Sequence, residues 1–281
     1  MTVFEGVSTA LVTPFRNGEI DEPALRELVE FQIEAGIDGL VPCGSTGESA
    51  TMSHAEHHRV VEIVVGEARG RVPVVAGTGS NNTREAIELT RHAKEAKADG
   101  ALLISPYYNK PTQDGIVAHF AEIARETRFP LVVYNIPGRT ASNMLPATLA
   151  RLADIEQIVG VKEASGDLGQ ISEVIACCPD DFSVLSGDDA LALPILAVGG
   201  RGVISTSANV APAEMVEMVN AFRAGTSRAP ARSTSGCCPS SARCSARRTR
   251  SPSRPPWPRW AESATRSACP SPRSRSRTAS A

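Results

Sequence analysis

Several features typical of other protein classes are missing from this 281-residue sequence. No apolar run approaches the roughly 20 residues that cross a bilayer, so no membrane association is expected. The first residues, 1–6, lack the basic and then apolar pattern of a signal peptide, which predicts a cytoplasmic location. No GxGxxG follows the first predicted strand, which argues against a dinucleotide-binding fold. Four of the 7 cysteines lie after residue 236, and their spacing matches neither a zinc motif nor, without a signal peptide, a disulfide framework.

The last part of the chain, residues 226–281, contains no Val, Ile, Leu, Met, Phe or Lys. It is built largely from 14 Ser, 12 Arg and 8 Pro, and it has little apolar surface to offset the entropy lost on ordering. We therefore expect this tail to be disordered. It has one acid and a formal charge of +11, whereas residues 1–225 hold 17 basic and 30 acidic residues, a formal charge of −13. The modest overall charge of −2 averages two unlike regions.

Residues 1–225 alternate about eight short apolar runs with amphipathic stretches, the pattern of βα units around a parallel sheet. The predicted strands are Val7–Phe15, Gly39–Gly44, Val72–Gly79, Gly100–Tyr108, Pro130–Pro137, Ile158–Ser165, Phe182–Asp188 and Gly202–Ala208. The predicted helices include Glu22–Ala35, Ala55–Ala68, Thr83–Ala98, Gln113–Thr127, Leu168–Cys177 and Pro212–Arg223. We predict an α/β fold, a (β/α)8 TIM barrel over 1–225 followed by the tail at 226–281. An open, doubly wound sheet of eight strands is the structural alternative.

One charged residue stands inside an apolar strand: Lys162 ends the run IVGVK. In a barrel the strand ends converge on the face where chemistry occurs, and burial there would lower the pKa of an amine toward the 7–8 that suits imine formation. The alternative is a structural lysine paired with Glu163 or another acid. The spacing of the residues does not choose between the two.

Two further strand ends carry groups of interest. Tyr134 lies in the second half of the preceding predicted strand, where its phenol would either relay a proton into the same cavity or pack at the rim. The segment GSTGE at 44–48 offers two hydroxyls and backbone N–H groups between glycines. This segment suits binding of a small carboxylate, but it would also suit a tight turn into the next helix.

Five motifs together resemble one family. GSTGES at 44–49, SPYYNKP at 105–111, YNIPGRT at 134–140, GVKEASGD at 160–167 and SGDD at 186–189 resemble the dihydrodipicolinate (4-hydroxy-tetrahydrodipicolinate) synthase family in both order and spacing. The resemblance covers residues 3 to about 225. It implies a carbon–oxygen lyase with a class I aldolase mechanism, which condenses pyruvate with aspartate semialdehyde in lysine biosynthesis and needs no cofactor or metal.

The resemblance also implies a role for each matching residue. Lys162 matches the Schiff-base lysine, and Tyr134 matches the tyrosine that relays protons. Ser45 stands where the family usually has threonine, and loss of the methyl group leaves its hydroxyl with less rotamer restriction. Tyr108 matches a tyrosine that completes the triad of a neighbouring protomer, which implies a homo-oligomer, a tetramer in the family. The substrate-binding positions that match are Thr46, Arg139, the backbone of Ile204, and Gly187.

Arg139 matches the arginine that holds the semialdehyde carboxylate, a task suited to a guanidinium fork. Because sialic-acid lyases of the same superfamily differ after YNIP, this residue favours the synthase over a sugar-acid or sialic-acid lyase. In isolation, an arginine here would more often form a surface ion pair.

Regulation by lysine is a further implication of the resemblance. The positions that match an allosteric lysine site are Ser49, Ala50, His54, His57, Asn81, Glu85 and Tyr107. His54, His57 and His58 would share a helical face, which raises the question of a metal site. No HExxH is present, and we expect no metal.

The sequence departs from the family after Gly225. With permitted GC-rich codons, a reading frame displaced by one base can encode ETNPIPVKAAM near Arg247–Pro255, which resembles the family's C-terminal helical domain. We therefore hypothesise a frameshift near codon 226. The alternatives are an Arg/Ser-rich tail that binds nucleic acid and, if the tail prevents assembly, a barrel that binds ligands without catalysis.

Overall fold

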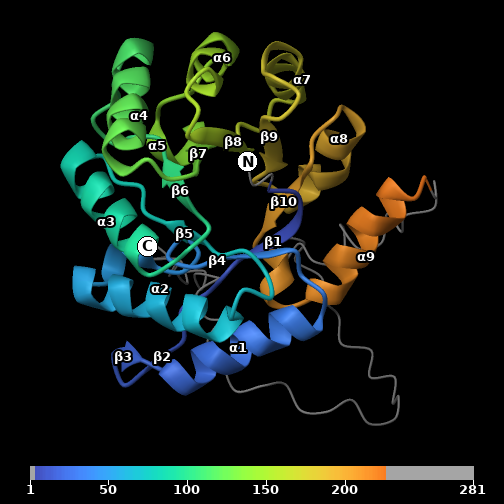
Figure 1. The fold of residues 1–281 in the computed structure, drawn as a ribbon. Coiled ribbons are helices and arrows are strands. Elements are labelled where there is room, and N and C mark those ends of the chain that lie inside the picture. The colour runs from blue at the N-terminus through green and yellow to red at the C-terminus, as the bar shows by residue number, and fades with distance from the viewer. Residues whose placement is uncertain (1–3, 226–281) are drawn as a thin grey trace, which may run out of the picture.

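Eight parallel strands form the centre of the molecule in the computed structural model, which describes residues 4–225 (Figure 1). The strands are β1 Gly6–Ala10, β4 Gly39–Val41, β5 Val75–Gly77, β6 Gly100–Ile104, β7 Leu131–Asn135, β8 Ile158–Glu163, β9 Ser183–Ser186 and β10 Gly202–Ser205. They are hydrogen bonded in the order β4-β1-β10-β9-β8-β7-β6-β5. A parallel bridge between Leu40 and Val74 joins the two outer members, so the sheet closes into a barrel.

Helices surround the barrel, as Figure 1 shows. They are α1 Glu22–Glu34, α2 His54–Ala68, α3 Thr83–Glu95, α4 Gln113–Thr127, α6 Pro146–Ala153, α7 Leu168–Cys177, α8 Ala192–Ala197 and α9 Pro212–Arg223. Shorter elements are the hairpin β2 Phe15–Arg16 and β3 Glu19–Ile20, the one-turn helix α5 Pro137–Thr140, and the 3-10 turns η1 Ser49–Thr51, η2 Asp189–Leu191 and η3 Ser207–Asn209. Side-chain caps mark several helix starts, and Ser53 and Glu56 form a full capping box at α2.

The apolar side chains form two separate cores. The larger one lies between the strands and the helices, and includes fully buried residues such as Leu28, Phe120 and Leu149. The smaller one fills the barrel and includes Val132 and Leu185, together with Tyr134. Because side chains alternate across each strand, one strand supplies both cores.

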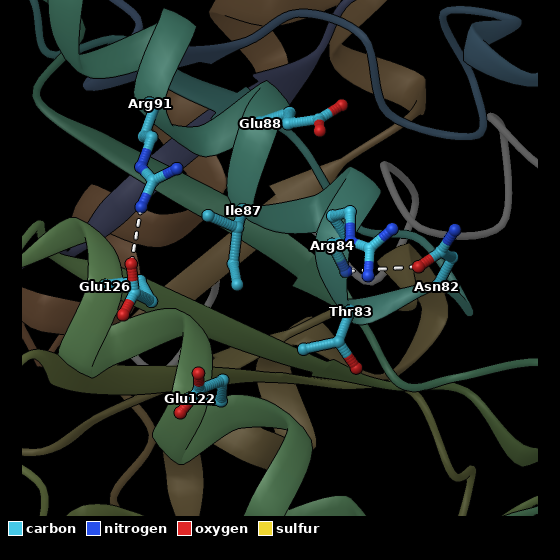
Figure 2. Close-up of a pocket in the computed structure, with 8 residues that line it drawn as sticks. All are labelled: Asn82, Thr83, Arg84, Ile87, Glu88, Arg91, Glu122 and Glu126. Atoms are coloured by element: carbon cyan, nitrogen blue, oxygen red, sulfur yellow. Dashed lines mark hydrogen bonds and ion pairs between the residues drawn. The ribbon is translucent and has the colours of Figure 1, made fainter.

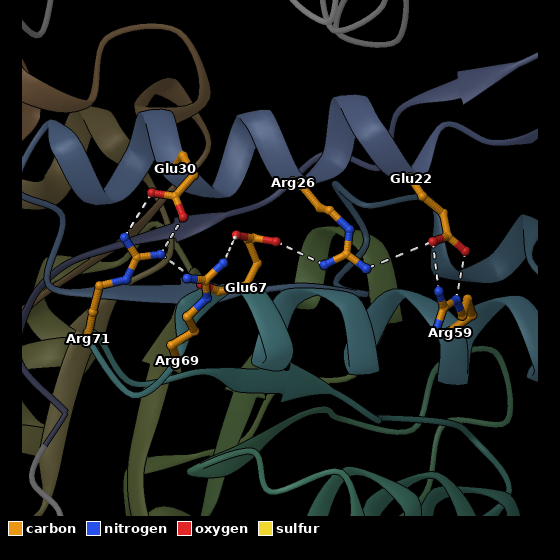
Figure 3. A network of polar contacts seen from close by, with 7 residues as sticks. All are labelled: Glu22, Arg26, Glu30, Arg59, Glu67, Arg69 and Arg71. Atoms are coloured by element: carbon orange, nitrogen blue, oxygen red, sulfur yellow. Dashed lines mark hydrogen bonds and ion pairs between the residues drawn. The ribbon is translucent and has the colours of Figure 1, made fainter.

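Polar contacts tie α1 to α2 on the outside of the barrel (Figure 3). Arg59 makes two hydrogen bonds of 2.7 Å to the Glu22 carboxylate, and Arg26 Nη1 lies 2.9 Å from Glu67 Oε2. Most of these side chains are more than one-third exposed, so each such pair stabilises little. The Glu67 side chain is only 11% exposed, which makes it the most shielded member of the network.

The predicted barrel is confirmed, and the predicted bounds of α4, α7 and α9 agree with the structure. The strands, however, end earlier than predicted: β1 stops at Ala10 and β6 at Ile104, since the following residues leave the sheet as loops. Helices α6 and α8 were not among the predicted segments. No helix within residues 4–225 has the length and apolarity to cross a membrane. The disorder predicted for 226–281 lies outside the described residues, and the domain boundary at 225 stays a prediction.

Candidate active site

A cavity of about 130 Å³ opens where the strands end. Six of the eight predicted catalytic and substrate-binding residues line it: Ser45, Thr46, Tyr134, Arg139, Lys162 and Gly187. They come from the ends of β4, β7, β8 and β9 and from α5, so segments that are distant in sequence converge on one space. This is the end of a (β/α)8 barrel at which catalytic groups are found.

Lys162 lies on β8 directly opposite Tyr134 of β7, and its Nζ is 4.3 Å from the centre of the Tyr134 ring. The lysine is 6% exposed. Burial lowers its pKa from 10.5 to about 8, while the nearby Asp189 carboxylate raises the pKa and Arg139 lowers it. A substantial fraction of the amine is therefore neutral, and thus nucleophilic, near neutral pH.

The structural alternative for Lys162, an ion pair with Glu163, is wrong. Adjacent residues of a strand face opposite sides, and Glu163 accepts hydrogen bonds from Asn135 and from the Ser165 N–H on the outer side of β8. Within residues 4–225, no carboxylate oxygen lies within 4 Å of Lys162 Nζ. The lysine is buried without a close counter-ion, the environment that favours a neutral amine.

Tyr134 is buried in the barrel, 7% exposed, with its ring over the lysine amine. Burial raises the pKa of its phenol to about 12, although Arg139 opposes this shift. The phenol is thus protonated at neutral pH and can donate a hydrogen bond to a reacting oxygen. Its position combines the two alternatives of the sequence, since it packs in the inner core and also lines the cavity.

Close approach of backbone shapes the cavity at Gly187 and Gly77. A Cβ at Gly187 would lie 3.0 Å from Lys162 Cε and 2.8 Å from Ala164 Cβ. A Cβ at Gly77 would lie 2.3 Å from the Cys43 carbonyl oxygen, so only glycine lets β5 pass the loop that carries Ser45 and Thr46.

Arg139 reaches the cavity from α5, the single turn that follows β7. The cavity is therefore lined by a buried amine, a phenol, four aliphatic hydroxyls and one guanidinium. This set can attack a carbonyl, move protons and bind a carboxylate.

Comparison with known proteins agrees with this arrangement. The model of the dihydrodipicolinate synthetase family matches residues 3–239. The chain belongs to this family. It is 61% identical over 223 residues to a 4-hydroxy-tetrahydrodipicolinate synthase of Syntrophus aciditrophicus, covering 79% of this chain and 77% of the relative.

Two solved structures show the same fold. Dihydrodipicolinate synthase from Aquifex aeolicus is 47% identical, with a TM-score of 0.80 over 82% of this chain and 79% of the other. The enzyme from Cyanidioschyzon merolae, described with lysine bound, is 42% identical, with a TM-score of 0.76 over 78% of this chain and 75% of the other.

Two of the eight predicted catalytic and substrate-binding residues do not line the cavity. Ile204 is 3% exposed in the inner core, whereas Thr206, two residues later, does line it. Tyr108 is 89% exposed, and its φ of +72° is uncommon for a bulky residue. Within one protomer, the structure does not bring Tyr108 to Lys162.

The residues that match the family's lysine site do not all lie together, and several of them form contacts around α2 and α3. His54 Nε2 lies 2.8 Å from Glu85 Oε1, and Asn81 donates to the Tyr107 carbonyl at 3.2 Å. His57 is buried with Nε2 2.8 Å from the Gly77 carbonyl oxygen. Ser49 lines the cavity itself, and Ala50 is exposed.

The histidines of α2 do not converge on one point. His58 stacks on His92 with ring centres 3.7 Å apart, while His54 and His57 have the other partners described above. No group of three or more potential ligands among residues 4–225 is arranged to hold a metal ion.

Asp189 was not among the predicted site residues. Its Oδ2 accepts hydrogen bonds from Ser207 N at 2.9 Å, Ser207 Oγ at 2.8 Å and Thr206 N at 3.2 Å, so it joins the loops after β9 and β10 at the edge of the cavity. It is also the carboxylate that acts on Lys162. The SGDD motif contained the signal, but only Gly187 was carried over from it.

A larger surface hollow of about 610 Å³ lies between α3 and α4 (Figure 2). Its lining is mainly charged, and Arg91 and Glu126 pair across it at 2.5 Å. None of the strand ends contributes to it, so the smaller cavity around Lys162 is the candidate active site.

Proposed function

We propose that this chain condenses pyruvate with aspartate semialdehyde to form 4-hydroxy-tetrahydrodipicolinate, a step of lysine biosynthesis, through an imine on Lys162. The observation that carries the proposal is the buried amine of Lys162 against Tyr134 at the cavity. Membership of the family and the name of the relative that is 61% identical support the same reaction.

The proposed reaction begins when the neutral Lys162 amine attacks the pyruvate ketone. The carbinolamine then loses water to give an iminium ion, and loss of a proton from the methyl group gives an enamine. The enamine carbon attacks the aldehyde of the second substrate, which forms the carbon–carbon bond. Ring closure by the substrate amino group then displaces Lys162 and releases the product.

The other residues have matching parts in this proposal. Tyr134 moves protons to and from the reacting oxygens, together with Ser45 and with Tyr108 of a neighbouring protomer. Thr46 and the backbone of Ile204 hold pyruvate. Gly187 leaves room beside the lysine stem, and Arg139 binds the semialdehyde carboxylate.

Borohydride reduction tests the imine. Pyruvate plus borohydride is expected to leave a reduced pyruvyl adduct on Lys162, located by peptide mass spectrometry. Lys162→Met is expected to abolish the adduct, whereas the exposed Lys97→Met serves as a matched control. Folded protein that gives no adduct on Lys162 would refute the proposal.

A second candidate is another pyruvate-dependent aldolase of the superfamily, acting on sugar acids or sialic acid. Arg139 at the cavity favours the semialdehyde, because a guanidinium fork matches its carboxylate. Side-by-side assays of semialdehyde condensation and sugar-acid cleavage distinguish the two. Faster cleavage than condensation would favour the second candidate.

We also propose a homo-oligomer, the family tetramer, in which Tyr108 of one copy reaches Lys162 of another. The exposure of Tyr108 on a single protomer supports this proposal. Sedimentation is expected to show an oligomer. Tyr108→Phe is expected to lower turnover while leaving assembly intact, whereas a fully active monomer would contradict the proposal.

Lysine is the proposed inhibitor, at the contacts made by His54, Glu85, Asn81 and Tyr107. The relative from Cyanidioschyzon merolae is described with lysine bound, which supports this reading. Calorimetry is expected to show lysine binding that Glu85→Gln weakens, and no heat with wild-type protein would refute it.

A cytoplasmic location also stays a prediction.

The tail bears on whether the chain is active. We propose that it results from a frameshift near codon 226. The alternative is that the altered tail prevents assembly, so that the barrel binds ligands without catalysis. Sequencing the gene across this codon and comparing turnover with a frame-restored version tests both. Ligand binding without turnover in this chain, together with turnover in the frame-restored version, would favour the ligand-binding barrel.

A further inference from the structure

We infer that Asn135 and Glu163 form a positioning pair that holds Lys162, Tyr134 and Arg139 in place from the outer side of the barrel. The inference rests on the proposed function, and it concerns two residues that do not touch the cavity. Their hydrogen bonds connect the two strands that carry Lys162 and Tyr134 to the segment that follows Arg139.

The first step is the register of β7 and β8. Tyr134 pairs with Lys162 and Asn135 pairs with Glu163, so the two pairs are consecutive rungs of the same ladder. Side chains alternate along a strand, which places one pair in the cavity and the other outside. Any slip between the strands would therefore disturb both pairs together.

The second step is the contact between the outer pair. Asn135 and Glu163 are both fully buried, and Asn135 Nδ2 lies 3.2 and 3.1 Å from the two Glu163 oxygens. The Ser165 N–H also donates to Glu163 Oε1 at 2.8 Å. A buried carboxylate held by neutral donors is costly to disturb, so it fixes the geometry of its neighbours.

The third step leads to Arg139. Asn135 Oδ1 accepts from Met144 N at 3.0 Å, and Asn135 Nδ2 donates to Asn143 Oδ1 at 2.9 Å. These contacts anchor the segment directly after α5, the turn that carries Arg139. Asn143 is in turn bonded to Gln170 of α7 at 2.7 Å, so the segment is held from two sides.

The buried carboxyl group of Glu163 has no cationic partner within 4 Å among residues 4–225. Burial raises the pKa of its carboxyl, although the Ser165 and Asn135 donors oppose the shift. A residue needed only to fill space on the outer side would be apolar, because burying this carboxylate costs stability. We therefore attribute its presence to the directed hydrogen bonds that it accepts from Asn135 and the Ser165 N–H, which an apolar side chain cannot make.

The test exchanges the polarity of the pair. Glu163→Gln leaves an amide donor facing the Asn135 amide, and Asn135→Asp sets two carboxylates about 3 Å apart. The double variant N135D/E163Q again places one amide opposite one carboxyl group. The matched control is Thr9→Val, which removes a buried 2.6 Å hydrogen bond to Gln32, and neither of these two residues lines the cavity.

Three readings are taken for each variant: the rate of pyruvate trapping on Lys162, kcat and KM for the semialdehyde, and the pH midpoint at which Lys162 is acylated. We expect E163Q to slow trapping and kcat by about 10- to 100-fold, since small displacements of reacting groups have effects of this size. KM for the semialdehyde should rise as the Arg139 segment loosens, and the Lys162 midpoint should rise as water enters. N135D should lower the trapping rate and kcat further than E163Q does, and the double variant should regain most of the lost trapping rate and kcat.

Thr9→Val should lower the melting temperature without changing these three readings. The inference is overturned if E163Q traps pyruvate within twofold of wild type and leaves the Lys162 midpoint in place. It is also overturned if the double variant is folded but traps pyruvate no faster than N135D. If the double variant does not fold, the measurements on E163Q alone decide. Wild-type protein that traps no pyruvate would instead refute the proposed function, and the acylation midpoint would still report on the positioning pair.

Discussion

The pKa of Lys162 can be measured without any assumption about the reaction. Burial lowers it from 10.5 to about 8, which corresponds to about 3 kcal/mol against the charged form. At pH 7 roughly a tenth of the amine would then be neutral, compared with about three in ten thousand for an unshifted lysine. This difference is large enough to see by trace acylation followed by mass spectrometry.

The expected result is a Lys162 acylation midpoint near pH 8, with the exposed Lys97 as internal reference. Two variants should move the midpoint in opposite directions. Asp189→Asn removes the carboxylate that raises the pKa, so the midpoint should fall, and Arg139→Met removes the cation that lowers it, so the midpoint should rise. A Lys162 midpoint at or above pH 10 in folded protein, or the same shift in both variants, would refute the electrostatic account of the site.

Four other outcomes are expected. Lys162→Met should raise the free energy of unfolding at pH 7 by up to about 3 kcal/mol, because a buried cation is removed. Denaturant titration measures this free energy, and a decrease in it would contradict the prediction. Gly187→Ala should slow pyruvate trapping, because its Cβ meets Lys162 Cε at 3.0 Å, and an unchanged rate contradicts this. Burial lowers the pKa of His119 from 6.5 to about 4, so stability should fall as pH drops through this interval, and His119→Gln should flatten that fall in a melting series. Glu67→Gln should lower the free energy of unfolding by about 1 kcal/mol at low salt and by less at high salt, because it removes the ion pairs with Arg26 and Arg69. A decrease that does not depend on salt would argue against a contribution from these ion pairs.

Helix bounds could be predicted well because local residues mark them. Thr112 and Asp167 cap α4 and α7 through side-chain hydrogen bonds, and Pro212 begins α9. Strand ends were harder, since apolar residues continue into the loops that leave the barrel. Leu11 is buried like a strand residue, yet it follows the end of β1.

The site was predictable where one residue conflicted with its surroundings. Lys162 was conspicuous in an apolar strand, and the family motifs placed Tyr134 and Arg139 beside it. Asn135 and Glu163 gave no such signal, because their contact depends on the register of β7 and β8. Register results from the packing of the whole barrel, which no short motif encodes.

The alternation along β8 also sets how this strand can change. Lys162 and Glu163 are consecutive residues with opposite charges, and the sheet directs one into the cavity and the other against Asn135. An insertion or deletion of a single residue earlier in the strand would exchange them, and a carboxylate would replace the amine in the cavity. Insertions or deletions in this strand are therefore tolerated only when they change its length by an even number of residues, whereas the loops on either side are free of that constraint.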